Sequence, residues 1–136
     1  MRLVVNTNRI IAALIRDSSS RKIIMSGKFE LITPRFSQKE VQNHKSEVVH
    51  KANITPRQFD QLLGIIMTKV YSTEDGVFNK KMKEAKEIIG DIDKDDEPFI
   101  ALALAVQNDG IWTDDNHFLK QSAVKVYTTA DILSLI

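Results

Sequence analysis

Residues 1–10 read MRLVVNTNRI, and the change from apolar to polar residues inside this stretch predicts how the chain begins to fold. Residues 3–5 are an apolar run of the kind found in β-strands that are covered on both faces. The polar residues 6–8 end this run, and the apolar side chains between Ile10 and Ile15 then follow at helical spacing. The chain therefore opens as strand, turn and helix, with the amide of Asn6 at the corner.

The composition is that of an ordinary globular protein. The 136 residues are 43% hydrophobic and 27% charged, so we expect one domain, residues 1–136, with its own hydrophobic core. The absence of cysteine excludes disulfides, thiolate nucleophiles and cysteine-based zinc sites. No apolar run reaches the length of a membrane span and no leader is recognised, which predicts a cytoplasmic protein without membrane contact.

The pattern farther along the chain continues to alternate strands with helices. Further strands are expected at residues 29–33, 111–113 and 124–127, whereas residues 71–78 are ambiguous. Ser37 and Glu40 fit a capping box that would place Glu40 in the first turn of a helix running toward His50. Further helices are expected at residues 20–26, after Thr55, at 80–89, at 99–106 (buried), from Asn116 and after Thr128. This alternation predicts an α/β fold whose central sheet is mostly parallel and flanked by helices.

Polar side chains mark several corners where a predicted strand or turn gives way to a helix. In open parallel sheets, ligands bind at such corners. The corner residues are Asn6, Glu40, Asp96, Asp114 and Asp115. Any one of them is more readily explained as a helix cap or as an acid near a helix N-terminus. The functional hypothesis therefore depends on the whole set.

Carboxylates without cysteine suit hard cations, which indicates Mg²⁺ or Mn²⁺ rather than zinc. Such ions activate water and offset the charge that develops on a phosphate, so phosphodiester hydrolysis is the natural reaction. The side chains of Thr7, Thr113 and Asn116 can orient the ligands.

Four pieces of the sequence, taken in order, resemble the PIN-domain family of metal-dependent ribonucleases. They are VVNTN at residues 4–8, Glu40, DEPFIALA at residues 96–103 and TDDNHF at residues 113–118. The resemblance implies a three-layer PIN-like fold and places the four catalytic, metal-holding positions of the family on Asn6, Glu40, Asp96 and Asp115. It adds Asp114 as a further candidate metal ligand and Asp93 as a residue that supports the ligands. It also implies cleavage of single-stranded RNA with Mg²⁺ or Mn²⁺, and many members are toxins of toxin–antitoxin pairs, often dimeric.

Asn6 departs from the family, which has an aspartate there. Two carboxylates about 4 Å apart repel by roughly 4 kcal/mol at an effective dielectric constant near 20, so an amide relieves strain in the metal-free fold. It also removes one anionic metal ligand. We therefore expect a stable fold with weakened or absent catalysis. An engineered Asp-to-Asn exchange is favoured over natural loss, because the other corner residues look intact.

Two other functions stay open. The first is a non-catalytic module that binds RNA or a protein partner, and the second is an RNA-processing nuclease without an antitoxin. Arg9 and Lys39 are the best candidates for contacts with substrate phosphates. Trp112 is expected in the core.

The three histidines lack zinc-site spacing, and we expect His117 to begin a helix or to support the metal ligands rather than bind metal itself. The helical hairpin of residues 37–70 is a candidate surface for a homodimer or an antitoxin.

Overall fold

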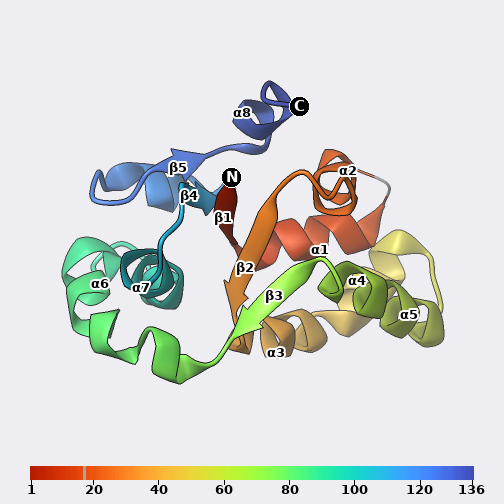
Figure 1. Ribbon diagram of the computed structural model, residues 1–136. Helices are drawn as coiled ribbons and strands as arrows, with labels where there is room; N and C mark the ends of the chain where they lie inside the picture. The colour runs from red at the N-terminus through yellow and green to blue at the C-terminus, as the bar shows by residue number, and fades with distance from the viewer. Residues whose placement is uncertain (17) are drawn as a thin grey trace.

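The computed structural model describes residues 1–16 and 18–136. Its centre is a parallel sheet with the strand order β3-β2-β1-β4-β5 (Figure 1). The strands are β1 (Arg2–Val5), β2 (Glu30–Pro34), β3 (Val70–Thr73), β4 (Gly110–Trp112) and β5 (Val126–Tyr127). The helices are α1 (Thr7–Ile15), α2 (Ser19–Met25), α3 (Phe36–Asn43), α4 (Lys45–Ala52), α5 (Pro56–Met67), α6 (Met82–Ile89), α7 (Glu97–Ala105) and α8 (Thr129–Leu133). Short 3₁₀ helices are η1 (Asp75–Val77), η2 (Asn79–Lys81), η3 (Lys94–Asp96) and η4 (Asn116–Lys120).

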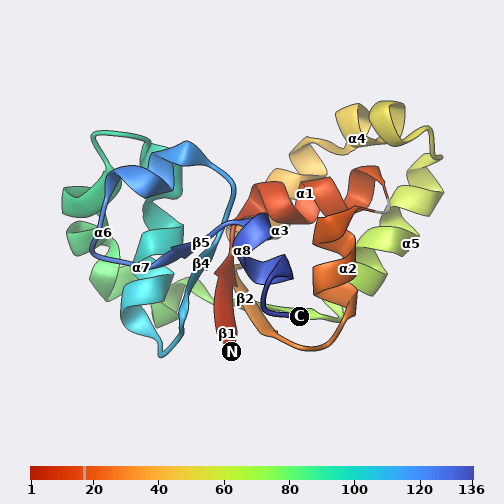
Figure 2. The ribbon, with the colours of Figure 1, turned by 90° about the horizontal axis from the view of Figure 1, so that it is seen from above.

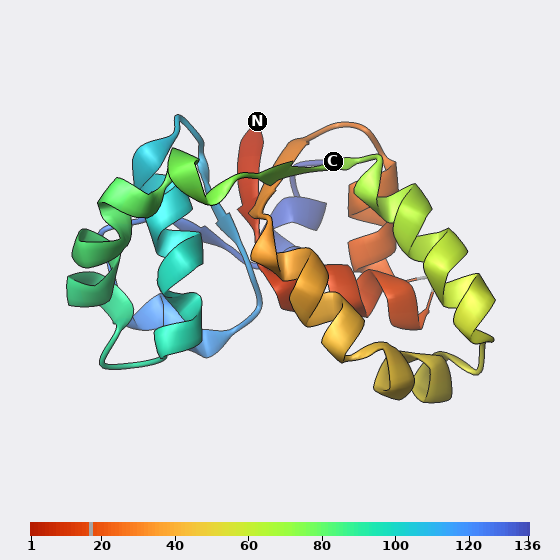
Figure 3. The same cartoon turned by 90° about the horizontal axis from the view of Figure 1, so that it is seen from below.

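The helices form a layer on each face of the sheet. Helices α6 and α7 lie on one side, and α1 to α5 lie on the other (Figures 2 and 3). Each layer has its own hydrophobic cluster against the sheet. The expected three-layer α/β fold is confirmed. No helix among the described residues combines the length and the apolar character needed to cross a bilayer.

Strand β1 shows why its sequence is apolar at every position from Leu3 to Val5. Leu3 and Val5 point into the cluster formed with α1 and α5, whereas Val4 points into the cluster formed with α6 and α7. All three side chains are fully buried. A strand covered by helices on both faces needs apolar side chains on both, so an alternating pattern is absent.

The strand order reverses next to β1. The chain runs outward from β1 to β2 and β3, and it then returns to place β4 on the other side of β1. Val5 pairs with Trp112 in register, and the Asn6 backbone N–H donates to the Trp112 carbonyl at 3.2 Å. The residues that follow β1 and β4 therefore meet at one edge of the sheet, at the topological switch point where α/β proteins bind ligands.

The predicted capping box at Ser37 is wrong. Helix α3 already begins at Phe36, and Ser37 lies inside it with a fully buried side chain. The Ser37 hydroxyl lies 3.0 Å from the Thr33 hydroxyl and 3.1 Å from that of Thr7, so it joins β2 to α1 instead of capping its own helix. Glu40 consequently lies beyond the first turn, and the helix expected to reach His50 is divided into α3 and α4.

Two other helices begin where the sequence predicts. Thr55 and Gln58 form the capping box of α5 with Pro56 in its first turn, as predicted, and Thr128 caps α8. The ambiguous residues 71–78 contain most of β3 and the turn η1, and the helix expected from Asn116 is the 3₁₀ helix η4. Trp112 is fully buried, as expected.

Candidate metal centre

A small cavity of about 170 Å³ lies at the carboxyl ends of β1 and β4. It is lined by Asn6, Thr7, Asn8, Ile11, Glu40, His44, Asp93, Asp95, Asp96, Phe99 and Asp115. Five of these side chains are carboxylic acids. All four residues that the resemblance assigned to catalysis line this cavity, although they come from well-separated parts of the chain.

Asn6 occupies the corner between β1 and α1, and it is only 3% exposed. Its side-chain oxygen accepts a hydrogen bond from the Asn8 backbone N–H at 2.8 Å and so caps α1. The capping explanation thus holds for this residue, which nevertheless faces the acidic cavity. Its amide oxygen is already engaged in the fold.

Glu40 enters the cavity from α3 and is held there by hydroxyl groups. The Thr7 hydroxyl donates to Glu40 Oε1 at 2.8 Å. Thr7 is itself in contact with Ser37 and, through it, with Thr33 of β2. Burial raises the pKa of the Glu40 carboxyl, and Asp95 raises it further, while the Thr7 hydrogen bond and His44 act in the opposite direction. The Thr7 hydroxyl therefore fixes the position of the Glu40 carboxyl in the fold.

Asp93 and Asp96 reach the cavity from the 3₁₀ helix η3. Residues three apart lie on the same side of such a helix, which brings these two carboxylates together. The Asp96 backbone N–H donates to the Asp93 carbonyl at 3.2 Å. Asp96 directly precedes α7, but its side chain forms no capping hydrogen bond to that helix.

The Asp96 carboxyl is the most strongly perturbed acid of the cavity. It is only 6% exposed. Burial, reinforced by the negative charges of Asp93 and Asp115, raises its pKa from 3.8 to about 7. His117 lowers the pKa of this carboxyl, but burial and the two neighbouring acids outweigh that effect.

Asp115 lines the cavity from the turn after β4, and His117 lies next to it at the start of η4. The Asp115 backbone N–H donates to the Thr113 hydroxyl at 3.0 Å, and Asp115 Oδ1 accepts from the His117 backbone N–H at 2.9 Å. This turn directs His117 Nδ1 toward three carboxylates, at 3.3 Å from Asp93, 3.8 Å from Asp96 and 3.5 Å from Asp115.

These residues fit a divalent cation. One ligand atom each from Asp93, Asp96 and His117 lies within 4.8 Å of the other two. Asp96 Oδ2 and His117 Nδ1 are both buried without a hydrogen-bond partner. Buried polar atoms in folded proteins normally have partners, and a bound cation would satisfy both of these.

Asp114 does not join this cluster, which corrects its assignment as a metal ligand. Its carboxylate forms an ion pair with Arg9 at 2.7 Å. It also accepts hydrogen bonds from the backbone N–H and the hydroxyl of Thr129, each at 2.7 Å. The side chain therefore ties α1 to the start of α8 instead of facing the cavity.

The two predicted substrate contacts also lie outside the cavity lining. Besides pairing with Asp114, Arg9 donates to the hydroxyls of Ser20 and Thr129, so its charge has structural partners. Lys39 lines a separate hollow between α3 and α5. Asn116 starts η4 and likewise does not line the acidic cavity.

Three polar residues of the cavity were not recognised as site candidates in the sequence: Asn8, His44 and Asp95. His117 was expected to begin a helix or to support the ligands; it lies at the start of η4, and its ring reaches the acids. The spacing of Asp93 and Asp96 is a signal for a shared 3₁₀ face, whereas Asp115 and His117 are joined by the hydrogen bond from the His117 backbone N–H to Asp115 Oδ1. The spacing does not reveal which acids the ring contacts.

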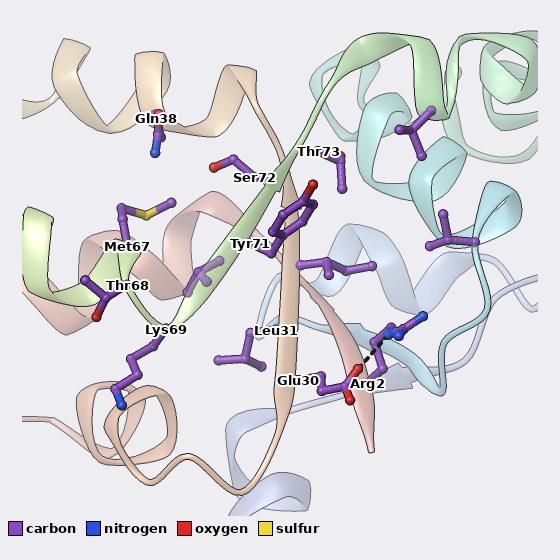
Figure 4. Close-up of a pocket in the computed structure, with 14 residues that line it drawn as sticks. Arg2, Glu30, Leu31, Gln38, Met67, Thr68, Lys69, Tyr71, Ser72 and Thr73 are labelled. Carbon is purple, nitrogen blue, oxygen red and sulfur yellow. Dashed lines mark hydrogen bonds and ion pairs between the residues drawn. The ribbon is translucent and has the colours of Figure 1, made fainter.

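A larger cavity, about 730 Å³, lies elsewhere in the molecule. It runs along the outer strand β3, where Tyr71, Ser72 and Thr73 line it (Figure 4). Among its described lining residues the one acid, Glu30, forms an ion pair with Arg2 at 2.9 Å. This cavity does not gather carboxylates, so its size does not make it the catalytic candidate.

Comparison with known proteins supports the interpretation of the fold. The family model described as "PIN domain" matches residues 4–134. No curated protein and no solved structure was found to match the chain. The family match runs through all five strands and includes every acidic residue of the cavity. The chain therefore belongs to the PIN-domain family.

Proposed function

We propose that the protein is a divalent-metal-dependent endoribonuclease for single-stranded RNA and that Asn6 weakens or abolishes its activity. PIN domains are generally nucleases, and this chain has their fold. The observation that carries the proposal is the meeting of Glu40, Asp96 and Asp115 in one cavity at the switch point of the sheet. Mg²⁺ or Mn²⁺ is the proposed cofactor, because the cavity is rich in carboxylate oxygens.

The charge of the cavity makes a cation necessary for this chemistry. Five carboxylic acids line the space, and a phosphodiester brought near their ionised forms would be repelled. When bound, a divalent cation supplies an activated water molecule and offsets the negative charge that develops on the phosphate. Asp96 and Asp115 would hold the cation. Thr7 orients the Glu40 carboxylate toward the same space.

The proposed weakness lies in what an amide offers at position 6. The Asn6 oxygen accepts the capping hydrogen bond from Asn8, which leaves the NH₂ group, a donor that cannot ligate a cation. An aspartate would keep the cap with one oxygen and present a second, anionic oxygen. Asn6 therefore supports the fold but removes a negative ligand from the centre.

The Asn6→Asp variant tests the proposal. We expect it to cleave single-stranded RNA in the presence of Mn²⁺ at least ~10-fold faster than the parent protein, because it restores an anionic ligand. Cleavage of an end-labelled RNA would be followed by gel electrophoresis. The double variant Asn6→Asp, Asp96→Asn is the matched control, and it should lose the gained activity. An Asn6→Asp protein that is folded and as inert as the parent would contradict the proposal.

The proposal also includes a biological role for the nuclease and its partners. Many family members are toxins, and we assign this chain the same role, with RNA, an antitoxin protein and a second copy of the chain as partners in the cytoplasm. The helical hairpin of residues 37–70 is the proposed contact surface, although the α5 side chains Phe59, Leu63 and Ile66 are buried in the core. A short antitoxin gene next to this one, together with a dimeric mass in solution, is the expected finding.

A second function is favoured by the capping role of Asn6. The Asn6 side-chain oxygen already accepts a hydrogen bond from the Asn8 backbone N–H. Because this asparagine has a role in the fold, the protein can also be a non-catalytic module that holds RNA or a protein. That alternative predicts an Asn6→Asp variant that binds RNA without cutting it. Measuring binding by fluorescence anisotropy beside cleavage separates the two functions.

A further inference from the structure

We propose that Asp93, Asp96 and His117 form a mixed nitrogen and oxygen site that selects a transition-metal ion such as Mn²⁺ or Co²⁺ over Mg²⁺. This inference rests on the metal centre of the proposed function and assigns its preferred ion. It differs from the all-carboxylate centre that the family resemblance implies, because a histidine nitrogen becomes a ligand.

The position of the imidazole carries the argument. His117 Nδ1 lies 3.3 Å from Asp93 Oδ2, 3.5 Å from Asp115 Oδ1 and 3.8 Å from Asp96 Oδ2. Neighbouring ligand atoms around one divalent ion are separated by about 3.0–3.5 Å, given metal–ligand distances near 2.1 Å. The separations around Nδ1 are close to this range, so small movements suffice to place the atoms around one ion.

A second, independent observation comes from hydrogen bonding. Asp96 is more than nine-tenths buried, and its Oδ2 has no hydrogen-bond partner although it faces the cavity. His117 Nδ1 is also buried and without a partner, despite the three carboxylates around it. Two buried, unsatisfied ligand atoms of different chemical type, 3.8 Å apart, indicate a site for an ion rather than an internal hydrogen bond.

The donor type then sets the preference. Mg²⁺ is bound by oxygen ligands and keeps much of its water shell, whereas imidazole nitrogen suits the transition metals. Asn6 strengthens this preference, since the amide removes a carboxylate that a hard cation would use. The cavity therefore has an amide in place of an anionic oxygen at position 6 and a nitrogen donor at His117.

The test compares metal affinities of the parent protein and of His117→Asn by isothermal titration with Mg²⁺, Mn²⁺ and Co²⁺. We expect His117→Asn to weaken Co²⁺ and Mn²⁺ binding at least ~10-fold and to change Mg²⁺ binding less than about 2-fold. The matched control is His50→Asn, because His50 is an exposed histidine of α4 outside the cavity. Circular dichroism would verify that each variant is folded.

Two further readouts locate the ion. In a proton–nitrogen NMR spectrum, Zn²⁺ should shift the ring resonances of His117 and leave those of His50 in place. His117→Asp replaces the nitrogen with a carboxylate and should raise the affinity for Mg²⁺ relative to Co²⁺.

The inference fails if the parent protein binds Mg²⁺ as tightly as Co²⁺, or if His117→Asn weakens both equally. RNA cleavage by Asn6→Asp combined with either result would leave the proposed function intact and remove only the ion preference. Conversely, selective binding without any cleavage by Asn6→Asp would support the ion preference and contradict the nuclease proposal.

Discussion

At the scale of single residues, Asp96 is the side chain whose environment departs most from that of an ordinary surface acid. Its carboxyl is buried, it faces Asp93 and Asp115, and it lacks a hydrogen bond at Oδ2. Burial and like charge both favour the protonated form. The metal-free protein therefore stores an unfavourable charge at neutral pH, and a bound cation would offset it.

This arrangement predicts how stability depends on pH without metal. The pKa of Asp96 is raised in the folded state from 3.8 to about 7. The folded state therefore holds this proton more tightly, and the stabilisation is fully present below about pH 4 and lost as the pH rises through 7. Glu40, whose pKa is also raised, acts in the same direction. In EDTA, Asp96→Asn should become increasingly more stable than the parent between pH 5 and pH 8, as measured by urea unfolding.

The exposed Asp75 of η1 supplies the control for this measurement. Asp75→Asn should follow the pH dependence of the parent protein. A constant stability difference between Asp96→Asn and the parent across the whole range would show that the Asp96 proton is not linked to folding.

At the scale of elements, the corner after β4 separates two neighbouring aspartates into different roles. Asp115 turns into the acidic cavity, whereas Asp114 joins Arg9 of α1 and Thr129 of α8. The two acids are neighbours in the sequence. Which of them faces the cavity depends on the path of the backbone after Trp112, and residue spacing does not reveal that path. Chain spacing could therefore locate the corner but could not assign its two carboxylates.

The connection between α1 and α8 gives a prediction about stability. Asp114→Asn should lower the free energy of unfolding by about 1–2 kcal/mol, because it weakens an ion pair and two charge-assisted hydrogen bonds in a partly buried setting. Metal affinity should stay unchanged, as measured by titration. Glu30→Gln removes the exposed pair with Arg2 and should cost less than about 1 kcal/mol. A large loss of metal affinity in Asp114→Asn would restore Asp114 as a ligand candidate.

The start of α3 shows a different limit of sequence reasoning. The residues from Ser37 to Glu40 fit a capping box, yet the Ser37 hydroxyl is used between Thr33 and Thr7. Those partners lie on β2 and α1, and contacts between elements can override a local pattern. The capping box at Thr55 was predictable because that helix start is on the surface, where local groups have no competing partner from another element.

At the scale of the whole molecule, the order of the elements could be predicted almost completely. Apolar strands, helix spacing and corner residues indicated a parallel sheet covered on both faces, and the structure has it. The same pattern brought Glu40, Asp96 and Asp115 to one edge. What it could not provide was the angle of each side chain, so the approach of His117 to three carboxylates became visible only in three dimensions.

The shared sheet predicts that the two helical layers unfold together. Strands β1 and β4 contribute side chains to both hydrophobic clusters, so loss of one cluster exposes the other. Fluorescence of the buried Trp112, which packs in the cluster of α1 and α5, should therefore change at the same urea concentration as helical circular dichroism. Separate transitions would show that the α6 and α7 layer can open independently.

The pairing of β1 with β4 has a consequence during protein synthesis. Val5 lies beside Trp112, so β1 leaves the ribosome more than a hundred residues before the strand that it pairs with. Asp115 follows that later strand. A nascent chain that ends before residue 115 therefore lacks one of the acids that line the cavity, and the acidic lining is completed only late in the synthesis of this domain.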